Sequence, residues 1–187
     1  MQVKLLQLTP DALNFIGKCA SICYDSEDSY ERNIKRAIAC KEKGHLATLR
    51  FAHATFNVSG ISRACSHQFV RSKHLDFLQR SQRYCEEDNP QVVIPDSMSL
   101  PLVADVCEYS YEVYKRLLSF GVKKEDARYI LPQGFCTELN VVGNLQAWKD
   151  FIELRTSKAA QEEIRLVAIA INNILARELP GMFEEMK

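Results

Sequence analysis

The sequence lacks a net charge and any long run of apolar residues. Its 24 lysines and arginines equal its 24 aspartates and glutamates. This balance argues against a general nucleic-acid binder, because affinity for a phosphate backbone grows with the number of basic contacts. No apolar run approaches the ~20 residues that a membrane-spanning helix needs. We therefore expect a protein that binds neither long nucleic acid nor a membrane.

Paired metal-binding motifs are also missing. The seven cysteines include no CxxC pair, and the four histidines show no ligand spacing with them. Zinc sites depend on such spacing, so we expect no bound metal. An odd number of cysteines, with no signal peptide expected at the start of the chain, is typical of a reducing compartment. These features predict free thiols and a cytoplasmic location.

The 187 residues, 47% of them hydrophobic, are enough for one domain with a full core. Strands are predicted at 3–8 and 47–58, with an extended segment that ends at 142. Helices are predicted at about 10–19, 29–43, 61–73, 101–120, 123–130, 144–155 and 157–177. Residues 74–92 are predicted to form a long loop. The pattern favours a single helix-rich α+β domain over residues 1–187.

A basic segment, residues 63–84, stands out in this neutral chain. It contains five Arg or Lys residues, two His and a single acid, Asp76. On the predicted helix, Arg63, His67 and Arg71 share one face at i, i+4 and i+8. Arginine offers a forked donor to phosphate, and a side chain such as Gln68 can pair with the polar edge of a base. The mixture therefore predicts a site for a small anion with a planar base.

No protein nucleophile is evident in this segment. Ser81 has no neighbouring base in a Ser-His-Asp pattern, and Cys65 falls on the apolar side of its predicted helix. If the protein is an enzyme, we expect a cofactor to carry the chemistry. Two distant arginines are further candidates. Arg155 either binds phosphate at a second site or neutralises the C-terminal dipole of its own helix. Arg128 lies between apolar residues, and an inward side chain there would need an anionic or carbonyl partner.

Three stretches carry a resemblance to a known family: GHLATLRFAHATFNVSGISRACSHQFVRSKHLDFLQRSQRY, which begins at Gly44, then ARYILP and FIELRTSKAAQEEIR. In order, they resemble the flavin-dependent thymidylate synthases, the ThyX family. The resemblance implies a ThyX-like fold with a central antiparallel or mixed sheet. It also implies homotetramers with active sites between subunits, and synthesis of dTMP from dUMP. Methylenetetrahydrofolate would donate the carbon, and NADPH would reduce bound FAD.

The resemblance also assigns roles to individual residues. It implies that dUMP is held by Gln68, Ser81, Gln82, Arg83, Arg128 and Arg155. Arg155 would in addition polarise the pyrimidine ring as the catalytic residue. The positions on the FAD side are His45, Arg71, Ser72, Lys73 and Asn144. The family's signature begins Arg-His-Arg, whereas this chain has Arg71-Ser72-Lys73.

Alternative functions stay open at this point. A diverged relative could install a hydroxymethyl group on dUMP or dCMP, or could bind nucleotides without catalysis. A module that binds RNA or DNA through residues 63–84 is a further alternative. The sequence leaves uracil and cytosine undecided, because Gln68 and Gln82 can each donate or accept hydrogen bonds.

Overall fold

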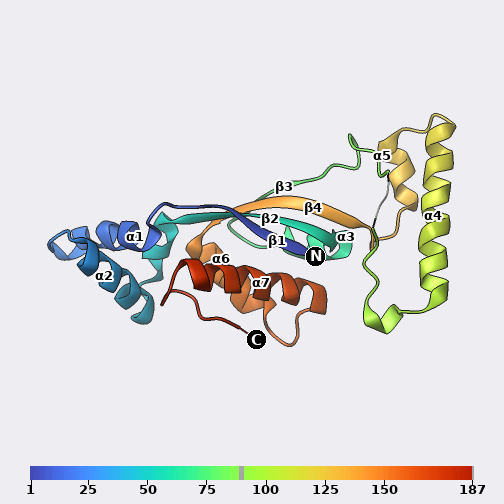
Figure 1. Ribbon diagram of the computed structural model, residues 1–187. Helices are drawn as coiled ribbons and strands as arrows, with labels where there is room; N and C mark the ends of the chain where they lie inside the picture. The colour runs from blue at the N-terminus through green and yellow to red at the C-terminus, as the bar shows by residue number, and fades with distance from the viewer. Residues whose placement is uncertain (89–90, 187) are drawn as a thin grey trace.

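The computed structural model describes residues 1–88 and 91–186 (Figure 1). Within them, an antiparallel sheet of four strands has the order β1-β2-β4-β3. Its strands are Gln2–Leu8 (β1), His53–Ser62 (β2), Leu75–Gln79 (β3) and Cys136–Asn144 (β4). The architecture is therefore α+β, as the sequence predicts.

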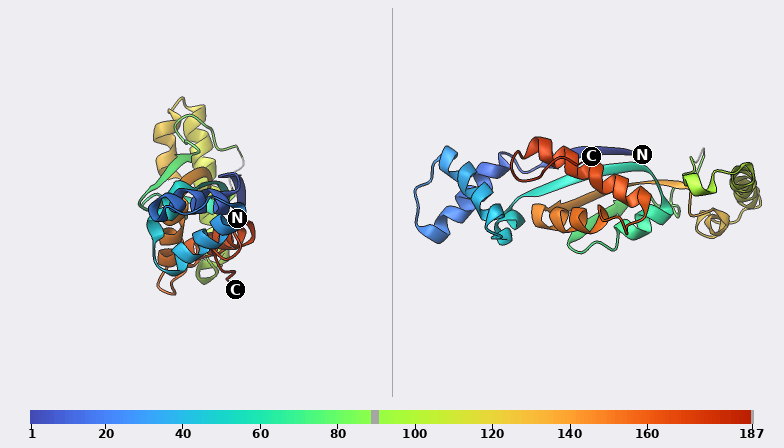
Figure 2. Two further views of the ribbon diagram at one scale, coloured as in Figure 1. Left: turned by 90° about the vertical axis from the view of Figure 1, so that its left-hand side faces the viewer. Right: turned by 90° about the horizontal axis from the view of Figure 1, so that it is seen from below.

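Helices cover one face of the sheet and extend it at both ends (Figures 1 and 2). The sheet rests on Leu145–Arg155 (α6) and Glu162–Glu178 (α7). One end carries Ala12–Ser21 (α1) and Tyr30–Glu42 (α2), and the other carries Pro101–Ser119 (α4) and Lys124–Ala127 (α5). The short helix α3 is Arg63–Phe69. Short 3-10 turns are Ile22–Tyr24 (η1), Leu46–Phe51 (η2), Asp96–Met98 (η3) and Arg128–Ile130 (η4).

The core lies between the sheet and the α6–α7 pair. Alternate residues of β2 and β4 point into it, and α7 contributes an apolar stripe of Ile164, Val167, Ala168, Ile171 and Leu175. Trp148 of α6 is fully buried, and its indole Nε1–H donates to the Ala54 carbonyl at 3.0 Å. Its ring meets the edges of Phe56, Phe69 and Phe151. The indole thus joins α6, the sheet and α3.

Local signals explain where several elements begin and where two helices approach closely. Asn144 caps α6, because its Oδ1 accepts from the Ala147 N–H at 2.9 Å. Pro101 occupies the first turn of α4. Gly17 of α1 lies against α2, and a Cβ at this position would come within 1.9 Å of the Asn33 carbonyl oxygen.

Four predicted boundaries are wrong. The strand predicted at 47–58 begins only at His53, because Leu46–Phe51 forms η2. The helix predicted at 61–73 is shorter, since Ile61 and Ser62 still pair with β4 and the chain turns after Phe69. The loop predicted at 74–92 contains β3, and the helix predicted from 157 starts at Glu162.

None of the helices within residues 1–88 and 91–186 is long and apolar enough to cross a membrane.

Candidate functional site

A cavity of about 370 Å³ lies between α3 and the connection that leads from α5 to β4. Helix α3 contributes Arg63 and His67, one turn apart, and Arg128 comes from η4. Gln82 lines it from the turn after β3. The remaining lining residues are Tyr129, Leu131, Pro132 and Gln133. The basic segment and one of the two distant arginines therefore meet at one cavity.

The cavity carries uncompensated positive charge. Arg63 and Arg128 form no ion pair with a carboxylate among the described residues. Burial lowers the pKa of the Arg63 guanidinium, Glu87 opposes the shift, and the nearby charge of Arg128 adds to it. The two guanidinium groups carry like charges, so they repel each other across the cavity. An anion bound between them would relieve that repulsion.

Gln82 lines the same cavity and carries a buried donor without a partner in the described part of the chain. Its side chain is only 5% exposed, and its Nε2 is buried with no hydrogen-bond partner among the described residues. A buried polar group without a partner costs about 1–3 kcal/mol. A ligand acceptor would remove this cost if the amide rotated toward the cavity that Gln82 lines.

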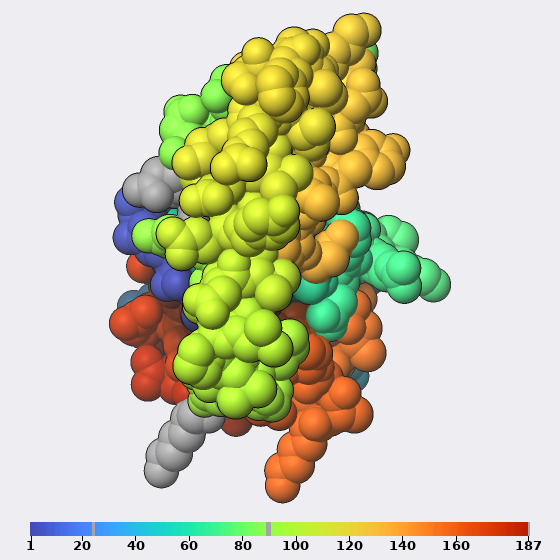
Figure 3. Space-filling view, turned by 90° about the vertical axis from the view of Figure 1, so that its right-hand side faces the viewer, coloured from blue at the N-terminus to red at the C-terminus, as the bar shows by residue number. Residues whose placement is uncertain are grey.

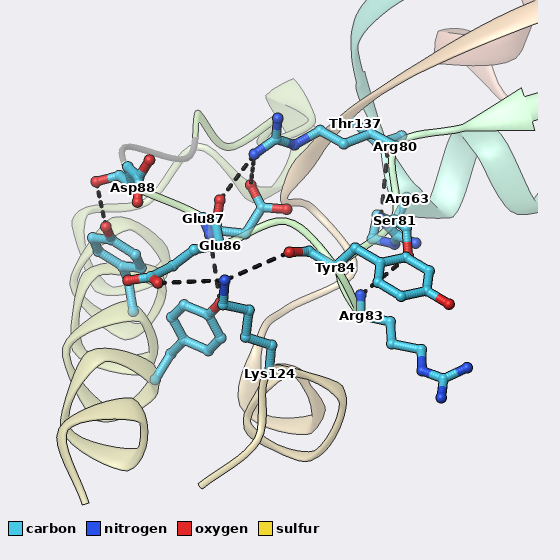
Figure 4. Close-up of polar contacts among 12 residues, drawn as sticks. Arg63, Arg80, Ser81, Arg83, Tyr84, Glu86, Glu87, Asp88, Lys124 and Thr137 are labelled. Carbon is cyan, nitrogen blue, oxygen red and sulfur yellow. Dashed lines mark hydrogen bonds and ion pairs between the residues drawn. The ribbon is translucent and has the colours of Figure 1, made fainter. Parts of the chain in front are cut away.

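Ser81 and Arg83 do not line the cavity, although they flank Gln82. Arg83 instead pairs with Glu125 of α5, with 2.6 Å between Nε and Oε2. Its backbone N–H donates to the Ser81 hydroxyl oxygen at 3.2 Å. In Figure 4 the Arg83 side chain extends away from Ser81. The structure thus separates these two predicted ligands from Gln82 and Arg128.

The segment that carries Ser81 and Arg83 is held against α4 and α5 (Figure 4). Lys124 lies 3.7 Å from the carboxylate of Glu86, and Tyr111 donates its hydroxyl to the carbonyl of Asp88. Arg80 pairs with Glu87 at 3.7 Å. These contacts fix the course of the chain between β3 and the cavity.

Gln68 and Arg155 contact each other but do not line the 370 Å³ cavity. Arg155 Nη2 donates to the Gln68 carbonyl at 2.9 Å, at the end of α3. Its Nε is buried without a partner among the described residues. Arg128 also finds a carbonyl, since its Nε donates to the Glu125 oxygen at 3.1 Å. This confirms that Arg128 needs an anionic or carbonyl partner.

A second cavity, of about 190 Å³, contains one of the residues expected on the cofactor side, Asn144. Its other lining residues are Arg50, His74, Gln146, Ala147 and Asp150. The turn that holds Arg71, Ser72 and Lys73 lies at the same end of the sheet, because Leu75 pairs with Gly143. Because α3 ends at Phe69, Arg71 does not continue the helix face of Arg63 and His67. His45 directly precedes η2 and is not among the lining residues of this cavity.

The second cavity and the neighbouring turn carry positive charge and two buried polar atoms without partners in the part of the chain that the structure describes. Ser72 Oγ and Gln146 Oε1 are buried with no hydrogen-bond partner among the described residues. Arg50 lines the cavity, and Arg71 and Lys73 are exposed in the neighbouring turn. These donor and acceptor atoms fit a phosphate-bearing cofactor. The cavity's volume of about 190 Å³ is below the ~300–1,000 Å³ typical of a ligand pocket.

Sequence reasoning missed several lining residues. Arg50, His74 and Gln146 come from three separate elements, and no local pattern connects them. Arg63 and His67 belong to the small-anion site that their i, i+4 spacing predicts, but the resemblance assigns neither of them a ligand. Cys65 is buried as expected, and burial raises the pKa of its thiol, Glu163 adds to this shift and Arg155 opposes it. This thiol is therefore a packing residue rather than a thiolate.

The chain is an antiparallel α+β protein with two polar cavities, one near each end of strand β4. A family model described as "Thymidylate synthase complementing protein" matches residues 4–181. The chain belongs to this family, the flavin-dependent thymidylate synthases.

Similar proteins carry the name of this family. A flavin-dependent thymidylate synthase of Mycobacteroides abscessus is 32% identical over 204 residues, which cover 93% of this chain and 78% of the relative. One of Geobacter sulfurreducens is 32% identical over 200 residues, 99% of this chain and 86% of the relative. One of Mycobacterium sp. strain JLS is 33% identical over 170 residues, which cover 78% of this chain and 67% of the relative.

Proposed function

We propose that the protein is an FAD-dependent thymidylate synthase that transfers a one-carbon unit from methylenetetrahydrofolate to C5 of dUMP and yields dTMP. NADPH is the proposed reductant. The observation that carries this proposal is the 370 Å³ cavity, where Arg63, Arg128 and the unpaired Nε2 of Gln82 meet in a chain of this family. Two guanidiniums and one amide donor match a phosphate joined to a base with carbonyl oxygens.

The protein's own residues divide the work between the two cavities. Arg63 and Arg128 hold the nucleotide phosphate, and Gln82 orients the base through its free Nε2. Arg155 is proposed to polarise the pyrimidine ring, with its side chain anchored at the Gln68 carbonyl. Gln68, Ser81 and Arg83 remain proposed dUMP ligands, whose side chains reach the nucleotide after the Arg83–Glu125 pair opens or across a subunit boundary. Reduced FAD, when bound, supplies the electrons that no side chain here can supply.

Arg50, Arg71, Lys73 and Asn144 are proposed to hold FAD, with Ser72 Oγ as a further partner and His45 at the edge of the site. One chain's 190 Å³ cavity contains only a fraction of a dinucleotide. This supports a homo-oligomer, proposed to be a tetramer, in which neighbouring subunits complete the FAD sites. A monomer in light scattering that still forms dTMP would reject this assembly.

Helix α4 supports the same assembly. It occupies the middle of one end face of the molecule (Figure 3). Its exposed apolar side chains are Leu102, Val106 and Tyr109. Exposed apolar patches of this kind often mark contacts between proteins. We propose that α4 lies at a subunit interface of the homotetramer.

All seven cysteines are free. This supports a cytoplasmic location as part of the proposal.

The proposed function is tested on purified protein by its visible spectrum and its products. A flavin band near one FAD per chain is expected, together with dTMP formation from dUMP, methylenetetrahydrofolate and NADPH. Formation of hydroxymethyl-dUMP, or of a product from dCMP alone, would contradict this function and favour a diverged hydroxymethylase. Oligonucleotide binding with a steep salt dependence and no response to dUMP or dCMP would reject it.

The Arg71-Ser72-Lys73 sequence gives a prediction for FAD affinity. Replacing Ser72 by His and Lys73 by Arg adds a stacking ring and a forked donor beside the 190 Å³ cavity. We expect FAD binding to tighten by roughly 1–3 kcal/mol, the scale of one or two charge-assisted hydrogen bonds. FAD titration measures this, with dUMP affinity as the control that should not change. Unchanged or weaker FAD binding would mean that the chain holds the cofactor by other contacts.

The Arg83–Glu125 pair gives a prediction for dUMP affinity. If Arg83 binds the nucleotide phosphate, Glu125 competes with the phosphate for it. Glu125→Gln should then tighten dUMP binding by up to about fivefold, since partly exposed pairs are worth ~0.2–1 kcal/mol. Glu86→Gln is the matched control, because Glu86 pairs with Lys124 instead. Weaker dUMP binding in Glu125→Gln would show that Glu125 orients Arg83 rather than competing for it.

A further inference from the structure

The N-terminal end of α3 is tied to α7 by two hydrogen bonds to one carboxylate. The backbone N–H of Ser62 donates to Glu163 Oε1 at 2.7 Å, and the Ser62 hydroxyl donates to Oε2 at 2.6 Å. The same hydroxyl oxygen accepts from the Cys65 N–H at 2.9 Å and so caps α3. Ser62 is only 3% exposed. Glu163 therefore fixes the capping hydroxyl from outside the helix.

The C-terminal end of α3 is tied to the connection between α6 and α7. Arg155 Nη2 donates to the Gln68 carbonyl at 2.9 Å, and Gln68 Nε2 lies 3.5 Å from Gln161 Oε1. All of these partners belong to residues 155–163, which we call the α3 clamp. One continuous segment thus holds both ends of the helix.

A clamp matters for this helix because α3 is short and carries charge into the cavity. Its seven residues are too few to form a stable helix without tertiary contacts. Arg63 and His67 project from it into the 370 Å³ cavity, where Arg63 faces the like charge of Arg128. Repulsion between the two guanidiniums favours movement of α3 away from Arg128. The hydrogen bonds to Glu163 oppose that movement.

We propose that Glu163 is a positioning residue for the anion cavity: its carboxylate holds α3 so that Arg63 stays within reach of the ligand that Arg128 binds. Glu163 is not among the residues that line this cavity and lines a separate apolar cavity of about 500 Å³ instead. It acts through Ser62 and α3. The identity of the ligand as dUMP rests on the proposed function, whereas the mechanical role of Glu163 does not.

The test compares Glu163→Gln with Glu162→Gln. Glutamine at 163 keeps an acceptor for the Ser62 N–H, but the Ser62 hydroxyl loses its charge-assisted acceptor and meets an amide N–H₂ instead. Glu162 is exposed, and Glu162→Gln removes the same charge from the first turn of α7. We expect Glu163→Gln to weaken dUMP and inorganic phosphate binding about tenfold. Hydrogen exchange at the α3 amides should speed up at least tenfold. Glu162→Gln should change neither, and FAD binding should be kept in both.

Ser62 provides the second variant and a rescue. Ser62→Ala should weaken phosphate and dUMP binding as Glu163→Gln does. Ser62→Thr keeps the hydroxyl and should retain most of the wild-type affinity. The double variant Ser62→Ala with Glu163→Gln should lose little more affinity than either single variant. Should Glu163→Gln fail to fold, Ser62→Ala carries the same comparison.

The outcomes separate this inference from the proposed function. Wild-type affinity for inorganic phosphate and unchanged α3 exchange in folded Glu163→Gln would overturn the positioning role. Equal losses of dUMP and FAD binding would also overturn it, because they would indicate a general structural role. A wild-type protein that binds phosphate but neither dUMP nor FAD would reject the proposed function, while the exchange and phosphate measurements would still decide the role of Glu163.

Discussion

Replacing Trp148 by alanine should lower the free energy of unfolding by about 3–5 kcal/mol, the cost of truncating a large buried aromatic side chain. The indole is 0% exposed and touches the rings of Phe56, Phe69 and Phe151. Loss of the indole N–H would also leave the Ala54 carbonyl without this donor. Because typical domains are stable by about 5–15 kcal/mol, the variant should lose a large part of its stability.

Urea denaturation followed by circular dichroism measures this loss. Fluorescence is unsuitable, since Trp148 is the only tryptophan in the sequence. Leu154→Ala on the same helix is the control, because Leu154 is 61% exposed and its loss should change stability by less than about 0.5 kcal/mol. Similar losses in the two variants would mean that α6 is not held to the sheet and α3 through Trp148.

The long elements were predictable because each carries its signal within its own sequence. The stripe of α7, the Pro101 start of α4 and the apolar residues of β2 and β4 depend only on local periodicity and capping. The elements that were misplaced depend on partners far away in sequence. Strand β3 has only five residues, and it pairs with residues of β4 that lie sixty or more positions later. Likewise, Ile61 and Ser62 extend β2 because β4 lies beside them.

The same distinction explains the candidate site. Sequence reasoning identified Gln82 and Arg128 through a family resemblance, and the structure brings both to one cavity. It could not foresee that the neighbouring Arg83 turns to Glu125, because that choice depends on how α5 packs near the basic segment. Nor does any sequence spacing connect Ser62 with Glu163, although their two hydrogen bonds fix α3.

Removing either arginine of the 370 Å³ cavity should weaken dUMP binding without lowering the free energy of unfolding. Arg63→Ala and Arg128→Ala should each weaken dUMP binding by roughly 10- to 100-fold, since a hydrogen bond to a charged group is worth about 1.5–3 kcal/mol. Arg63→Lys should recover only part of the affinity, because lysine keeps the charge but not the fork. Each alanine variant also removes one of two like charges, so the ligand-free protein should be no less stable than wild type.

Isothermal titration with dUMP and FAD, together with urea denaturation, tests both effects. Arg50→Ala is the matched control, because Arg50 lines the 190 Å³ cavity instead. It should weaken FAD binding while leaving dUMP affinity unchanged, the reverse of the result for Arg63→Ala. If Arg63→Ala lost stability together with dUMP affinity, the guanidinium would be a structural group of α3. If Arg63→Ala instead kept or gained stability while losing dUMP affinity, the charge of Arg63 would serve ligand binding rather than folding.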